Sequence, residues 1–284
     1  MKLYRYFGIY FETDIENVRL EKDNRLFMDP YLLYRGKDEL SQKGYQKVDN
    51  FFKRLLFCAK QNQDKIAYEM VNNLHEREET RLGYSLQSHH GNGFSKNSGK
   101  KIYEEIKENP VFQQGFIQDV FDLPILMRKV GNDRISDMIT NIIFTDLLAF
   151  TVQQCEEYKI PMEEVNLMVK KWDEDKQKWE NYRQEYLPIY KDKSPVVFVP
   201  KTMVTSLPMF SYEKVYRGFY LPYYEKQEQK LGNSKFLLTY QNGKQRINKK
   251  ELKKQYPCNK EEIIALVQQH YPEYQDYKNS LLLK

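Results

Sequence analysis

The acidic residues best suited to chemistry in this sequence lie among apolar residues, where a charge is costly. Asp29 ends one apolar segment, and Asp133, Asp137 and Asn141 follow one another every four residues through another. On a helix, residues four apart share a face, so these three polar groups would form one stripe. An ionised carboxylate buried there needs a cation, a metal ion or several hydrogen-bond donors to offset its desolvation.

Three carboxylates from separate parts of the sequence could combine into a metal site. Glu76 and Glu79 are three residues apart and would face the same way on a helix. If Asp29, Glu79 and Asp137 meet in space, their oxygens suit Mg²⁺ or Mn²⁺.

Structural roles would explain the same aspartates. Asp133 follows Gly131-Asn132 and is suited to cap a helix N-terminus. Asp137 would be satisfied by a buried ion pair with an arginine such as Arg81 or Arg128. The sequence leaves both interpretations open.

A loop rich in glycine and serine follows the glutamates. Residues 81–101 read RLGYSLQSHHGNGFSKNSGKK. Backbone N–H groups and hydroxyls in such a loop can hold a phosphate, and the residues that we assign to this role are Ser85, Ser88, Gly91 and Gly93. The loop is not a P-loop, because the GxxxxGK[ST] pattern would need glycine at Phe94 and serine or threonine at Lys101. A loop that only links two helices and binds nothing would have the same composition.

Two cations would complete a catalytic set. Lys201 ends an apolar segment and Arg81 opens the loop, and both could stabilise charge developing on a scissile phosphate. The Asp-Pro at a strand end and the strand-borne Lys201 resemble parts of the Asp…(Asp/Glu)-x-Lys arrangement of restriction-type nucleases. Val199 stands where that arrangement has its second acid, and the resemblance covers only a few residues.

These residues favour a metal-dependent phosphodiesterase or nuclease acting on DNA or RNA, of the kind found among bacterial defence effectors. One alternative is a non-catalytic subunit that binds a partner protein or nucleic acid. Another is an enzyme that binds or hydrolyses a nucleotide. The sequence contains no GxSxG, HExxH or CxxC motif that would favour a different catalytic class.

Basic residues are concentrated near the C-terminus. A net charge of +5 over 284 residues is too small for a dedicated nucleic-acid binder. From residue 244 to residue 254, however, six basic residues accompany a single acid, Glu251. The candidate nucleic-acid contacts are Lys249, Lys250, Lys253 and Lys254. A solvated helix face would show the same pattern.

Composition predicts a globular protein, since 40% of the residues are hydrophobic and 14% are aromatic. No window approaches the ~18 uncharged apolar residues of a membrane span. Three distant cysteines and a start without a signal-peptide cleavage site favour a cytoplasmic location. We therefore expect no membrane association, and the oligomeric state stays open.

The hydrophobic pattern predicts a predominantly helical α+β fold, with a small sheet packed around a long central buried helix. Helices are expected over 40–63, 64–76, 100–109, 134–158 and 170–185, with two short ones beginning at Lys249 and Lys260. Strands are expected over 2–12, 25–29 and 195–201, and a hairpin over 237–247 with Asn242-Gly243 at its turn. We expect a main α+β domain over 1–205, with the Gly/Ser-rich loop at 81–101, and a smaller basic, tyrosine-rich helical region over 206–284.

Overall fold

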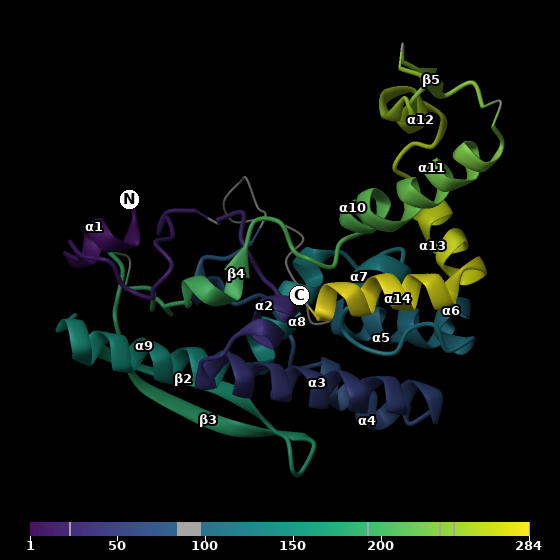
Figure 1. Cartoon of the computed structure of the whole chain (residues 1–284). Helices are drawn as coiled ribbons and strands as arrows, with labels where there is room; N and C mark the ends of the chain where they lie inside the picture. Colours follow the sequence, from purple (N-terminus) through teal and green to yellow (C-terminus); the bar gives the residue numbers. More distant parts are fainter. Residues whose placement is uncertain (23, 84–97, 192, 233, 241, 284) are drawn as a thin grey trace.

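The computed structural model describes residues 1–22, 24–83, 98–191, 193–232, 234–240 and 242–283. Figure 1 shows a mainly helical molecule. Its described residues form three separate two-stranded antiparallel sheets. The expected α+β class with predominant helix is confirmed. Several individual elements differ from the sequence prediction, and each difference has a local physical reason.

The long helix α3 (Glu39–Lys60) anchors the body. Asp38 caps it by accepting a hydrogen bond from the Ser41 backbone N–H at 2.8 Å. Its apolar residues recur at helical spacing and face the core, as the sequence predicts. The neighbouring helices of the body are α2 (Pro30–Arg35), α4 (Asp64–Val71), α5 (Ser98–Glu108), α6 (Pro110–Gln113) and α7 (Leu123–Leu126), with a 3-10 turn at Glu78–Thr80.

The expected single helix over 134–158 is two helices. They are α8 (Asn132–Ile142) and α9 (Phe144–Tyr158), and they meet at an angle of 68°. The Asn141 side chain donates to the Asp137 carbonyl, which competes with the helical ladder just before the bend. Among the described residues no single helix is long and apolar enough to cross a membrane, and α8 and α9 pass that test only as this bent pair. Gly131 is the N-cap of α8, so Asp133 lies in its first turn instead.

The N-terminal strand prediction is wrong. Residues 3–7 form α1 (Leu3–Phe7), which ends at Gly8 with a positive φ of 69°. The predicted strand near residue 27 is present as β1 (Phe27–Met28), and it pairs with β4 (Val204–Thr205) in antiparallel register.

Residues 196–200 are buried, but among the described residues this predicted strand forms only isolated bridges, and it ends in a 3-10 turn at Lys201–Met203. Their backbone N–H groups bind loops and side chains. The Val197 N–H donates to the Glu79 carbonyl at 2.8 Å, and the Phe198 N–H donates to Thr151 Oγ1 at 2.8 Å. This segment is therefore pinned to two other parts of the chain without joining a sheet.

The predicted exposed helix over 170–185 is a long hairpin. Its strands are β2 (Glu163–Asp173) and β3 (Lys178–Leu187), and Trp172 lies opposite Trp179. Trp172 is buried against Phe51, with ring centroids 4.8 Å apart. Packing of the two tryptophans against α3 and α4 thus overrides the polar character of the strands.

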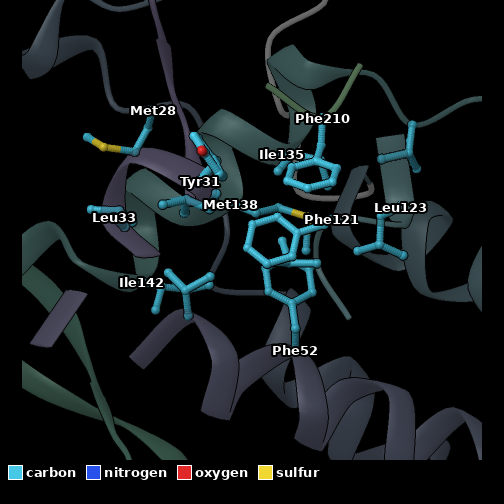
Figure 2. Packing of buried hydrophobic residues seen from close by; sticks show 14 of the residues in the cluster. Met28, Tyr31, Leu33, Phe52, Phe121, Leu123, Ile135, Met138, Ile142 and Phe210 are labelled. Atoms are coloured by element: carbon cyan, nitrogen blue, oxygen red, sulfur yellow. The ribbon is translucent and has the colours of Figure 1, made fainter. Parts of the chain in front are cut away.

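Figure 2 shows the apolar centre of the molecule, where segments distant in sequence meet. Phe52 of α3 and Met138 of α8 lie beside Phe121, and Phe210 lies beside Phe121 and Ile135. The Phe121 and Phe210 rings are 4.7 Å apart. The polar junction described below lies on α8, so this core fixes its position.

The C-terminal part begins after this core and returns to it. Its elements are α10 (Tyr212–Val215), a π-helix at Tyr216–Tyr220, α11 (Leu221–Lys230), β5 (Leu237–Thr239), β6 (Gln245–Ile247), α12 (Lys249–Gln255), α13 (Lys260–Gln269) and α14 (Tyr271–Leu282). The predicted hairpin and both short helices are confirmed. In Figure 1, β5 and α12 project at the upper right, while α14 lies across the body.

Candidate functional site

The polar face of α8 is a junction of three segments. The Ser136 hydroxyl accepts a hydrogen bond from the Met28 N–H at 2.9 Å. One and a half turns later, the Asn141 amide donates to the His75 carbonyl and accepts from Arg77 Nε at 3.0 Å. The segment that carries Asp29 therefore meets α8 just before Asp137, and the segment that carries the 76–79 glutamates meets it just after. We call the set of Met28, His75, Arg77, Ser136 and Asn141 the α8 junction.

Asp29 is 2% exposed and holds two segments together. Its Oδ1 accepts from the Tyr31 N–H, which caps α2, and its Oδ2 accepts from the Met209 N–H, both at 2.9 Å. Burial raises the pKa of the Asp29 carboxyl, and the two N–H donors and the nearby Lys214 act in the opposite direction. A structural role accounts for this carboxylate.

Arg77 is the residue of the junction that sequence analysis missed. Its side chain is buried, its guanidinium lies 4.1 Å from the centroid of the Phe144 ring, and it makes no ion pair with a described residue. Burial lowers its pKa to about 10, an effect that Glu79 opposes. Three glutamates surround Arg77, a composition typical of a solvent-exposed stretch, and this run of charge is the one feature of the sequence that singles Arg77 out.

The two other acids predicted as metal ligands are half-buried. Asp137 lies on α8 one turn before Asn141, and the Glu79 carbonyl accepts from Val197. Within the described part of the chain, no three His, Cys, Asp or Glu side chains are grouped so that they could hold a metal ion. The Mg²⁺ or Mn²⁺ site built on Asp29, Glu79 and Asp137 stays a prediction.

The two predicted catalytic cations have separate surroundings. Arg81 has a positive φ of 58° and donates from Nη2 to Ser194 Oγ at 2.7 Å. Lys201 Nζ lies 3.6 Å from the exposed Glu12 carboxylate. Arg128, one suggested partner of Asp137, instead pairs with Glu261 at 2.6 Å. The phosphate-binding residues predicted in the Gly/Ser-rich loop, Ser85, Ser88, Gly91 and Gly93, lie outside the described residues.

Residues 10–211 match a family described as a domain of unknown function, DUF8370. The chain belongs to this family. The match includes the whole α8 junction and ends at Ser211, the residue that caps α10. No curated protein and no solved structure matches the chain.

A strongly basic segment lies beyond the DUF8370 match. Residues 231–256, which we call the basic arm, comprise the β5–β6 hairpin and α12. They contain seven basic residues and one acid, a net charge of +6, which leaves the rest of the chain at −1. The basic residues are Lys235, Lys244, Arg246, Lys249, Lys250, Lys253 and Lys254. The net positive charge of this protein is thus concentrated in one projecting segment.

The four predicted lysine contacts share one side of α12. At about 100° per residue, positions 249, 250, 253 and 254 fall within an arc of about 140°, and the buried Leu252 lies outside it. Lys249 pairs with Glu225 at 3.0 Å and Lys254 with Glu251 at 2.8 Å. All four lysines are exposed, and Lys250 and Lys253 make no ion pair with any described side chain.

Proposed function

We propose that this protein binds nucleic acid through the basic arm. The observation that carries the proposal is the local charge, because a net +6 within 26 residues contrasts with −1 for everything else. A concentrated set of lysines on one face of a projecting element attracts a polyanion over a Debye length of roughly 8–10 Å. Phosphate contacts of this type supply most of non-specific nucleic-acid affinity.

The geometry of α12 leaves part of its positive charge available for phosphate contact. The Asn248 side chain caps the helix by accepting from the backbone N–H groups of Lys250 and Glu251, at 3.2 and 3.3 Å. The cap satisfies N–H groups at the start of α12 and so stabilises the helix that carries the lysines. Glu225 and Glu251 pair with two of the four lysines. The other two, Lys250 and Lys253, can contact phosphate without breaking an ion pair with a described residue.

Neutralising the four lysines tests this function. In the variant K249Q/K250Q/K253Q/K254Q, we expect affinity for a fluorescent 20-nucleotide DNA or RNA at ~50 mM salt to fall more than tenfold. The slope of log K against log salt should decrease by about 3, since each phosphate contact adds somewhat less than one. Fluorescence anisotropy over a salt series measures both.

A matched control removes the same charge elsewhere. The exposed lysines Lys37, Lys60, Lys65 and Lys171 lie outside the arm, and their joint change to glutamine should leave both affinity and salt slope close to those of the wild type. Equal loss in both variants, or no oligonucleotide binding by the wild type, would contradict binding through the arm.

Metal-dependent phosphodiester hydrolysis is the second candidate. Its supporting observation is the α8 junction, where the neighbours of Asp29 and Glu79 both bind α8 close to Asp137. A buried arginine beside these acids would offset negative charge there. In such an enzyme the basic arm would hold the polymer while the junction acted on it.

A metal titration tests this second candidate. Mn²⁺ or Mg²⁺ should raise the melting temperature of the wild type relative to EDTA, because a ligand that binds only the folded state stabilises it. Asp137→Asn should abolish the rise and any metal-dependent cleavage of an oligonucleotide. Asp133→Asn is the control, because Asp133 is exposed on the first turn of the same helix and loses the same charge. A wild type whose melting temperature ignores both metals would rule out the site.

A further inference from the structure

The β5–β6 hairpin of the basic arm has two faces of different character. Its register pairs Leu237 with Ile247, Leu238 with Arg246 and Thr239 with Gln245. The ladder continues past the strands, because the Tyr240 N–H donates to the Lys244 carbonyl at 2.9 Å. Side chains alternate along a strand, so positions 238, 240, 244 and 246 lie on one face.

The opposite face is the one that packs on the molecule. Ile247 is 2% exposed and Leu237 is half-buried against the core cluster. Phe236, directly before β5, is also buried, so the solvent-exposed part of the outer face begins at Leu238.

The outer face combines apolar and cationic side chains in the open. Leu238 is 45% exposed and Tyr240 is 51% exposed. Lys244 and Arg246 are exposed beside them, and neither makes an ion pair with a described residue. The Tyr240 ring stacks on no described aromatic side chain. Among the described residues, the two cations on this face therefore have no ion-pair partner and the Tyr240 ring has no aromatic neighbour.

We propose that this outer face binds single-stranded nucleic acid, with Tyr240 stacking on an unpaired base and Lys244 and Arg246 on the flanking phosphates. The inference rests on the proposed nucleic-acid function of the arm and deepens it. An exposed aromatic ring between cations is the combination that single-strand binders use, because every base has a face on which a ring can stack. In a duplex those base faces are covered, so a stacking tyrosine favours unpaired strands.

Charge complementarity favours nucleic acid over an apolar ligand on this face. The face lies within the segment of net charge +6, and the lysines of α12 follow it directly in the chain. An anionic membrane surface would also attract such a segment. The experiment therefore includes vesicles, and binding to vesicles in place of oligonucleotides would overturn the proposal.

The test compares strands and ring chemistry. Fluorescent 20-nucleotide single strands and a duplex of the same length are titrated with the wild type, Tyr240→Ala and Tyr240→Phe by anisotropy, with vesicles of 70% phosphatidylcholine and 30% phosphatidylserine titrated alongside. The wild type should prefer the single strand. Tyr240→Ala should weaken single-strand binding about five- to hundredfold and leave duplex binding unchanged, while Tyr240→Phe, which keeps the ring, should bind as the wild type does. Thr239→Ala on the adjacent, opposite-facing position is the control.

The outcomes separate this inference from the function on which it rests. If Tyr240→Ala binds single strands as the wild type does, or the wild type binds duplex equally well, stacking by Tyr240 is wrong although the arm can still bind phosphate. If no oligonucleotide binds in a salt-dependent way, the proposed function itself fails. Because Tyr240 is exposed, an unchanged melting temperature confirms that each variant is folded.

Discussion

Some buried polar side chains of this protein join segments that are distant in sequence. Asp29 binds the N–H groups of Tyr31 and Met209, and Arg77 binds Asn141 and lies over Phe144. Such groups are expensive to bury unless every contact is made, so they specify which segments meet. The α8 junction is therefore ordered by its polar contacts as well as by the core beneath it.

Lys260 provides a pH-dependent test at the scale of one residue. Burial lowers its pKa from 10.5 to about 8, while Glu105, Glu213 and Glu261 act in the opposite direction. Between pH ~8 and ~10.5 the folded protein has lost this proton and the unfolded chain still holds it, so stability should rise with pH. Urea denaturation of the wild type and of Lys260→Met at pH 7 and pH 9.5 should show a difference in unfolding free energy that moves in favour of the wild type at the higher pH.

The exposed Lys250 serves as the control for Lys260. Lys250→Met removes a lysine whose side chain is in solvent, so the difference in unfolding free energy measured for it is the baseline against which Lys260→Met is compared. A constant difference between the wild type and Lys260→Met would show that Lys260 is not desolvated in the folded protein.

At the scale of the element, local patterns predicted the helices that are amphipathic and the turn that needs glycine. The period of Val48, Phe51 and Phe52 identifies α3, and Asn242-Gly243 identifies the β5–β6 turn, where Gly243 has a φ of 75°. These features depend only on residues that are close in the sequence, so they can be predicted without knowledge of the fold.

The elements that were mispredicted depend on distant contacts. The strands of the β2–β3 hairpin carry charged residues on both sides of Trp172 and Trp179, so their period is hidden until both rings pack against α3 and α4. Residues 195–201 have the composition of a strand, but their N–H groups bind Glu79 and Thr151. The break at Ile143 lies two residues after Asn141, whose side chain also binds Arg77 and His75 of a distant segment.

The candidate site follows the same division. The sequence alone shows that Asp29, Asp137 and Asn141 lie among apolar residues, where burying a polar side chain costs free energy. That backbone N–H groups bind Asp29, and that Arg77 binds Asn141 of α8, could not be predicted, because both facts depend on the paths of the loops.

At the scale of the whole molecule, a buried ion pair joins the DUF8370 part to the C-terminal helices. Lys278 of α14 is 2% exposed and lies 2.8 Å from both Asp119 and Asp122. Asp122 is fully buried, and burial together with Asp119 raises its pKa to about 6, against the effect of Lys278. The basic arm is carried between α11 and α13, so this pair helps to fix the base of the arm to the family domain.

Removing Lys278 should destabilise the whole chain. Lys278→Met leaves two carboxylates without their cation, and we expect a loss of about 3–5 kcal/mol in unfolding free energy. Lys43→Met breaks a solvent-exposed pair with Glu39 and should lower the unfolding free energy far less. The fluorescence of Trp172 and Trp179 reports on the body, and far-UV circular dichroism reports on all helices. Because the pair links both parts, the two unfolding transitions should shift together in Lys278→Met. If the transition in circular dichroism shifts while that in tryptophan fluorescence does not, the C-terminal helices unfold on their own, and the arm is attached to the family domain by a hinge.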